Sequence, residues 1–316
     1  MTLAALQMLV GVPYVWGLWL TGLRKAPRIG LSQVRAVVPV AAAHTLAHLG
    51  AVVSIGAGAV GFVQVVKAAE PLFTAGLSFL TGSAMPWPVY LTLLPVIGGV
   101  TMASVGEISF SVLAFGAAMT SNASAASRSV LGKKFMAKTK KEDGLDAGNL
   151  YAVMTMLGCL VLTPLALAME GPKVTGVWSA AVNAGHSPAS LIKNGFLSGL
   201  FFYLYNEVSF YALNAIHPVT HALGNTLKRV VMIAVSVVVL KHTFTPLGLV
   251  GCCTAIGGVM AYSVTKAKLQ GKVSASSNTL ASSAEICAAP PSDVDAGADA
   301  GDGGSEAVTV GATTAK

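Results

Sequence analysis

Two adjacent cations interrupt an apolar stretch in the last third of the chain. Lys228 and Arg229 follow residues 220–227 and precede residues 230–240, which together are long enough to cross a bilayer. A lysine or arginine at the centre of a bilayer costs about 2.5–3.5 kcal/mol, so such residues usually face a protein interior or a water-filled path. The alternative is that both side chains extend along the helix to the membrane surface. Their mid-span position favours the first interpretation, in which they bind an anion.

A second charged segment contains Lys67, Glu70 and Pro71. Glu70 lies one helical turn after Lys67 and can share its face, so the two could form a self-neutralised pair. Because Pro71 has no N–H to donate to the carbonyl of Lys67, we predict that the helix bends at this lysine. One carboxylate cannot also neutralise Lys228 and Arg229. The sequence therefore predicts a surplus of positive charge within the apolar spans.

A cavity lined by these three cations would suit phosphate, because a guanidinium offers a bidentate fork and a lysine offers a compact charge. The other polar residues inside the apolar spans are His44, His48, Arg128, Tyr205, Glu207 and His221. Single buried histidines are more often hydrogen-bonded core residues than ligands, which is our interpretation of His44 and His221. Tyr205 could be a buried phenol or a hydroxyl donor to a substrate. Glu207 could pair with one of the cations.

The composition is typical of a helical membrane protein in contact with a lipid bilayer. Hydrophobic residues make up 54% of the chain and charged residues 10%, and there are 34 glycines in 316 residues. We predict nine membrane-spanning helices, at residues 3–21, 33–55, 58–81, 86–104, 108–132, 149–169, 190–214, 218–240 and 245–265. Basic residues cluster after the first, fifth and ninth of these, on one side of the membrane, as the positive-inside rule requires. The net charge of +7 therefore indicates topology rather than nucleic-acid binding.

The chain should consist of a transmembrane region, residues 1–268, and a disordered hydrophilic tail, residues 269–316. The tail is rich in Ser, Ala, Gly, Thr and Asp and has few large apolar residues. No nucleophile–base pair and no metal-ligand spacing converges within the spans, so we expect neither an enzyme nor a metal or cofactor site.

The polar motifs together resemble the plastidic triose-phosphate/phosphate translocators of the drug/metabolite transporter superfamily. The matching segments are HTLAH at 44–48, VKAAEP at 66–71, Ser121-Asn122, Arg128-Ser129, Lys133-Lys134, NLY at 149–151, GLFFYLYNEV at 199–208, PVTHALGN at 218–225 and Lys228-Arg229. The resemblance covers about residues 3–268. It implies an all-α bundle of two inverted five-helix halves, with nine of the ten transmembrane helices present and the first one missing.

The resemblance also implies roles for individual residues. Lys67, Lys228 and Arg229 would hold phosphate, Tyr205 would add its hydroxyl, His48 would face the three-carbon end of the substrate, and Arg128 would bind its carboxylate. The implied activity is exchange of inorganic phosphate for triose phosphate or 3-phosphoglycerate across the plastid inner envelope by alternating access. Three positions depart from the family pattern: Ala51 replaces a threonine, residues 61–64 replace Ser-Phe-Thr-His, and Glu207 replaces a glutamine.

Several alternatives remain open at this point. A translocator for phosphoenolpyruvate, glucose 6-phosphate or a pentose phosphate would use the same phosphate site. His48 favours the triose-phosphate branch, whereas Ala51 weakens that choice. A nucleotide-sugar antiporter is a further candidate, although relatives of that type commonly have Lys-Thr in place of Lys-Arg. A nontransporting membrane paralogue is the alternative from a different functional class.

Overall fold

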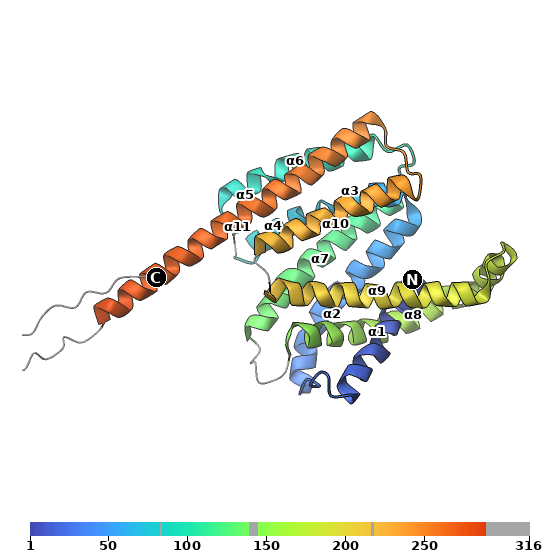
Figure 1. Cartoon of the computed structure of the whole chain (residues 1–316), viewed down its shortest axis with the longest axis horizontal. Helices are drawn as coiled ribbons and strands as arrows, with labels where there is room; N and C mark the ends of the chain where they lie inside the picture. The colour runs from blue at the N-terminus through green and yellow to red at the C-terminus, as the bar shows by residue number, and fades with distance from the viewer. Residues whose placement is uncertain (83, 139–144, 216–217, 289–316) are drawn as a thin grey trace, which may run out of the picture. The chain divides into compact units, whose positions relative to one another are not determined.

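The structure of the chain is a computed structural model that describes residues 1–82, 84–138, 145–215 and 218–288. Side chains are described in these ranges except at 136–138, 210, 212–215, 218–223, 225 and 270–288. All the regular elements in the described ranges are α-helices, which confirms the predicted fold class (Figure 1). The helices are α1 (Thr2–Leu20), α2 (Leu31–Ala57), α3 (Val60–Lys67), α4 (Glu70–Leu80), α5 (Trp87–Leu91), α6 (Leu93–Val105), α7 (Val112–Lys138), α8 (Ala147–Asn183), α9 (Pro188–Ala215), α10 (Pro218–Val238) and α11 (Pro246–Ala288).

The nine predicted spans correspond to these helices, with two of the spans interrupted. The third is divided into α3 and α4, and the fourth into α5 and α6. Five helical segments of the described ranges are long and apolar enough to cross a membrane: Thr2–Leu20, Leu31–Ala57, Trp87–Val105, Ala147–Asn183 and Pro246–Leu269. Helix α8 extends well past the predicted end at residue 169, because an apolar count limits a span to the membrane thickness whereas the helix continues beyond it.

The predicted bend at Lys67 is confirmed. Helix α3 ends at this lysine and α4 begins at Glu70. Between them, the amides of Ala68 and Ala69 donate to the carbonyls of Val65 and Val66 at 3.0 and 3.1 Å, the shorter-range pattern of a tightened last turn. The break places two charged residues at the facing ends of two short helices.

The helices that carry the charged motifs are neighbours in space. Helix α2 lies along α7 and also contacts α8, while α1 contacts α8 and α9 (Figure 1). Helix α10 packs against α3, and α4 packs against α7. Residues from both halves of the sequence are thereby brought to the break between α3 and α4.

Helices α6 and α11 approach each other closely along a row of glycines. A Cβ on Gly99 would lie 2.3 Å from the Ala255 nitrogen, and one on Gly251 would lie 2.5 Å from the Ala103 nitrogen. Since backbone atoms cannot move aside as a side chain can, only glycine fits at these two positions. Close packing through small residues is characteristic of helices in membranes.

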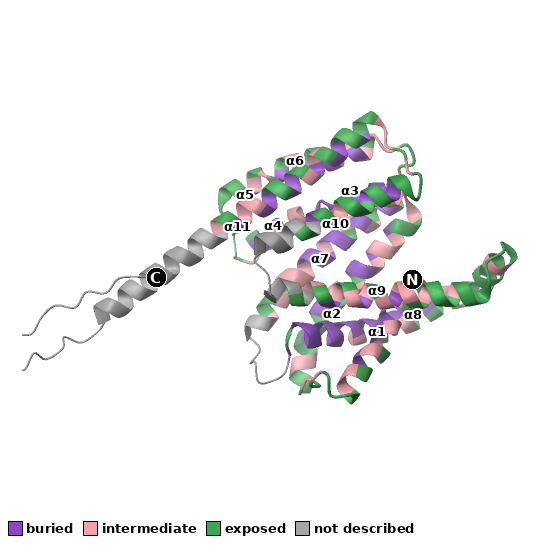
Figure 2. Cartoon of the chain, in the orientation of Figure 1, coloured by how far each residue is buried: buried purple, intermediate pink, exposed green. Residues whose placement is uncertain are grey.

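Large apolar side chains are found on the outside of the bundle as well as in its core. Tyr151, Tyr203 and Phe62 are fully buried, whereas Leu20, Leu80 and many similar residues are exposed (Figure 2). In water, so much exposed apolar surface would be unfavourable, but in a bilayer it faces lipid.

The chain divides into two units, Met1–Gly271 and Lys272–Lys316. Helix α11 ends at Ala288, within the range predicted for the hydrophilic tail. Residues 289–316 of that predicted tail lie outside the described ranges. The candidate site described next belongs entirely to the first unit.

Candidate anion-binding site

Lys67 is held by a neutral hydroxyl group. Its Nζ donates to Ser121 Oγ on α7 at 2.7 Å, and Ser121 Oγ in turn donates to the carbonyl of Ala47 on α2 at 2.6 Å. The neighbouring Asn122 donates from Nδ2 to the Val66 carbonyl at 3.0 Å, which ties α7 to the end of α3. Two side chains of α7 thus fix the position of the lysine and of the break beside it.

Arg229, rather than Lys67, is the ion-pair partner of Glu70. The distance from Arg229 Nη2 to Glu70 Oε2 is 2.9 Å, and the pair joins α10 to α4. The interpretation of Lys67 and Glu70 as a self-neutralised pair is therefore wrong: Glu70 begins a new helix after the break, and from there its carboxylate reaches α10.

Lys228 of α10 contacts Tyr205 of the neighbouring helix α9. Its Nζ donates to the Tyr205 hydroxyl at 2.5 Å and lies 4.5 Å from the centre of the phenol ring. Both residues are exposed in the structure. The lysine is thus oriented by a hydroxyl group that does not neutralise it.

Four other charged groups act electrostatically on the Lys67 ammonium: those of Glu70, Arg229, Lys228 and Arg128. Only Glu70 among these is negative, so the cluster carries more cations than anions. An anion entering this region would meet a net positive potential, and the cluster could bind phosphate through one guanidinium fork and two ammonium groups.

The two histidines of α2 occupy different surroundings. His48 is 7% exposed, and its ring stacks on Phe202 of α9 with centroids 4.0 Å apart. His44 is 2% exposed, and its Nδ1 lies 3.1 Å from Arg128 Nη1. The structure therefore brings all six predicted site residues into one region and adds His44, which sequence reasoning assigned to the core. The side chain of His221 is outside those that the structure describes.

Glu207 does not pair with the cations of the cluster. It forms an ion pair with Arg24, which lies in the loop between α1 and α2. Burial alone would lower the pKa of the Arg24 guanidinium, but its hydrogen bond and attraction to Glu207 outweigh burial and raise the pKa. The glutamate that departs from the family pattern is thus neutralised by an arginine that sequence reasoning did not connect to it.

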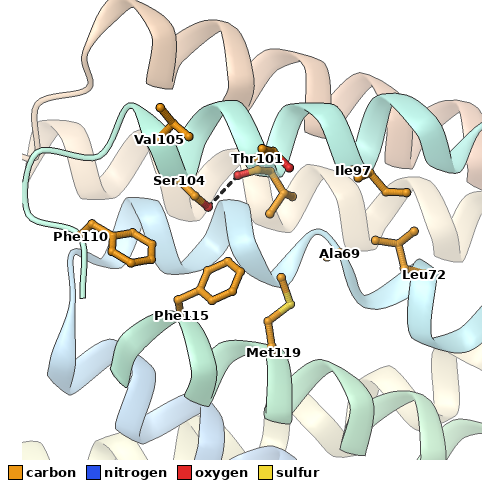
Figure 3. Close-up of a pocket in the computed structure, with 10 residues that line it drawn as sticks. Ala69, Leu72, Ile97, Thr101, Ser104, Val105, Phe110, Phe115 and Met119 are labelled. Carbon is orange, nitrogen blue, oxygen red and sulfur yellow. Dashed lines mark hydrogen bonds between the residues drawn. The ribbon is translucent and has the colours of Figure 1, made fainter. Parts of the chain in front are cut away.

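A cavity of about 400 Å³ lies between α4, α6 and α7 (Figure 3). Leu72, Ile97, Phe110, Phe115 and Met119 are among the residues that line it. None of its ten lining residues, all within the described ranges, is charged. This cavity therefore lacks the groups needed to bind an anion.

The helices and the cationic cluster define a multi-helical membrane protein with a polar region suited to an anion. Sequence comparison identifies the family within this class. Residues 1–263 match the Triose-phosphate Transporter family, and the chain belongs to it. The resemblance drawn from the motifs is confirmed.

The curated relatives are named for different phosphorylated substrates. The chain is 38% identical over 261 residues to phosphoenolpyruvate/phosphate translocator 1, chloroplastic, of Oryza sativa subsp. japonica, covering 82% of this chain and 63% of the relative. It is 37% identical over 270 residues to the chloroplastic triose phosphate/phosphate translocator of Flaveria pringlei, covering 84% and 64%. It is 36% identical over 254 residues to glucose-6-phosphate/phosphate translocator 2, chloroplastic, of Arabidopsis thaliana, covering 78% and 63%. The chain thus spans somewhat less than two thirds of the length of these relatives.

Proposed function

We propose that this protein is an antiporter that exchanges inorganic phosphate for triose phosphate or 3-phosphoglycerate across the plastid inner envelope. The observation that carries the proposal is the clustering of Lys67, Lys228 and Arg229, with Glu70 the one carboxylate among the charged groups that act on Lys67. Family membership and the names of the relatives support a phosphorylated substrate, and the chloroplastic relatives support the location.

Phosphate binding completes the charge balance of the cluster. In the structure, Lys67 and Lys228 each donate to a neutral hydroxyl group, Ser121 and Tyr205 respectively, while Arg229 is paired with Glu70. A phosphate dianion supplies the negative charge that these hydroxyl groups cannot. Tyr205 adds a hydrogen bond to the bound phosphate.

Charge balance also couples the two directions of transport. An empty site that is closed from both sides would hold several cations in a medium of low dielectric constant, which is costly. A bound phosphate or phosphate ester lowers that cost, so the loaded protein crosses between the inward-facing and outward-facing states more easily than the empty one. Exchange by alternating access follows from this difference.

The organic end of the substrate lies toward His48 and Arg128. His48 faces the three-carbon chain, and the Arg128 guanidinium is suited to a carboxylate such as that of 3-phosphoglycerate. The relatives are named for phosphoenolpyruvate, triose phosphate and glucose 6-phosphate, which have a phosphate group in common and differ in their organic part. A phosphoenolpyruvate or sugar-phosphate translocator is therefore the second candidate function.

Counter-exchange in proteoliposomes tests this proposal. Vesicles loaded with labelled phosphate are exposed to phosphate, triose phosphate, 3-phosphoglycerate, phosphoenolpyruvate or glucose 6-phosphate, and a nucleotide sugar serves as a further comparison. We expect release to require one of the phosphorylated C3 compounds or phosphate outside. Equal release with and without external substrate would contradict the coupling mechanism, and absence of any exchange would support a nontransporting protein.

Removing single positive charges tests the location of the phosphate site. Lys228→Ala and Arg229→Ala should each abolish phosphate exchange, whereas Lys193→Ala, which removes an exposed lysine near the start of α9, should leave it unchanged. Exchange at the unmodified rate in either of the first two variants would overturn the assignment of the phosphate site.

A further inference from the structure

His44 and Arg128 form a hydrogen bond in which only the arginine can donate, and this determines which nitrogen of the histidine carries a proton. The distance between His44 Nδ1 and Arg128 Nη1 is 3.1 Å. A guanidinium can only donate hydrogen bonds, so Nδ1 accepts and carries no proton. The ring is therefore neutral, with its proton on Nε2. His44 orients the guanidinium without removing its positive charge.

The His44 ring is held rigidly on its other side by buried aromatic side chains. Tyr151 of α8 meets it edge to face, with centroids 5.5 Å apart. Tyr203 of α9 lies 5.0 Å from Tyr151, and Tyr14 of α1 lies 5.3 Å from Tyr203. The rings of Tyr151 and Tyr203 are fully buried. Three helices, α8, α9 and α1, thus contribute aromatic rings to the support behind a single imidazole.

His44 is also placed where it can influence the substrate region. It lies one helical turn before His48 on α2, so the two histidines share a face of that helix. Arg128 is close enough to Lys67 for their charges to interact. His44 Nε2 is buried and has no hydrogen-bond partner among the described atoms.

We infer that His44 is a positioning residue for Arg128 and thereby determines how strongly the protein prefers phosphorylated carboxylic acids over phosphate esters with an uncharged organic end. This inference rests on the proposed function. A fixed guanidinium meets a carboxylate in one defined geometry, whereas a mobile one must lose conformational freedom on binding. Inorganic phosphate has no organic end to meet Arg128, so its binding depends on His44 much less than the binding of 3-phosphoglycerate does.

The test compares three substrates in one set of variants. His44→Phe keeps a ring against Tyr151 but removes the acceptor, and His44→Asn keeps an acceptor close to the position of Nδ1. In His44→Phe we expect the KM for 3-phosphoglycerate to rise about tenfold, the effect of one positioned hydrogen bond to a charged group. The KM values for phosphate and dihydroxyacetone phosphate should stay within about twofold. His44→Asn should restore most of the preference.

Equal rises for all three substrates would show that His44 only supports the fold, and an unchanged ratio would also overturn the inference. His44→Gln, whose acceptor is displaced by one methylene group, provides a second variant if His44→Phe does not fold, and it should lower the preference for 3-phosphoglycerate. Equilibrium binding of the same three compounds in detergent gives a readout that does not need transport. If the unmodified protein neither binds nor exchanges them, the proposed function fails as well. If it binds them with a preference that His44 does not affect, this inference alone fails.

Discussion

The Arg229–Glu70 pair implies that the protein supplies its own competitor for the proposed phosphate site. The two side chains are 13% and 31% exposed, and their atoms are 2.9 Å apart. In the proposed site, an incoming phosphate competes with Glu70 for the guanidinium and also approaches a carboxylate of the same sign. Glu70→Gln keeps the shape of the side chain and removes its charge. We therefore expect this variant to bind phosphate more tightly.

The size of the effect follows from the geometry of the pair. A hydrogen bond between charged groups contributes about 1.5–3 kcal/mol when it is buried. Because about a third of the Glu70 side chain is exposed, solvent screening places the value at or below the lower end of this range. A free-energy difference of about 1.4 kcal/mol corresponds to a tenfold change in an equilibrium constant. The KM for phosphate should accordingly fall about tenfold in Glu70→Gln.

Phosphate counter-exchange at a series of external concentrations measures this KM directly. Glu107→Gln is the matched control, since Glu107 lies 3.6 Å from His242 and does not belong to the cationic cluster. Its KM should stay within about twofold of the unmodified value. A tenfold higher KM in a folded Glu70→Gln protein would contradict this expectation. That result would mean that Glu70 holds Arg229 in its binding position instead of competing for it.

Three further substitutions test the surroundings of the site. Ser121→Ala removes the hydroxyl that holds Lys67 and should raise the phosphate KM about fivefold. Ser127→Ala is the control, because the Ser127 hydroxyl bonds only within its own helix, and it should leave the KM unchanged. Equal KM values in the two variants would contradict this expectation. Gly99→Ala should destabilise the protein by about 1–3 kcal/mol in thermal unfolding, because its Cβ would meet backbone, while Gly98→Ala, with open space around it, should be neutral or stabilising. Glu207→Gln leaves the partly buried Arg24 without its ion-pair partner and should lower stability by about 2 kcal/mol with no change in phosphate KM; an altered KM would place Glu207 in the site.

The parts of the fold that depend on local sequence were predictable. Pro71 determines the break in the helix because it lacks an N–H, and that holds in any environment. The apolar spans follow from the thickness of the bilayer, although the same reasoning could not foresee how far α8 continues beyond it. Local rules thus gave the helices and their interruption, but not their full lengths.

The pairing of charges was not predictable from one sequence. Glu70 was a candidate partner for Lys67 because it is three residues away, but its partner is 159 residues away on α10. Similarly, a buried glutamate at position 207 requires a cation, and several were available in the sequence. Which one it meets depends on how α9 packs beside the loop after α1. Long-range packing therefore determines which cations remain available to an anion.

The interruption between α3 and α4 places Lys67 at the C-terminal end of one helix and Glu70 at the N-terminal end of the next. Lys67 lies in the last turn of α3, toward which the peptide dipoles of that helix direct their negative ends, and Glu70 lies in the first turn of α4, where the amides give a partial positive charge. The dipole of its own helix thus favours each side chain, in addition to the contacts that Lys67 makes with Ser121 and Glu70 with Arg229. Exchanging the two residues would preserve the net charge but would oppose both dipoles. The polarity of the site is therefore set by the direction of the chain as well as by the residues along it.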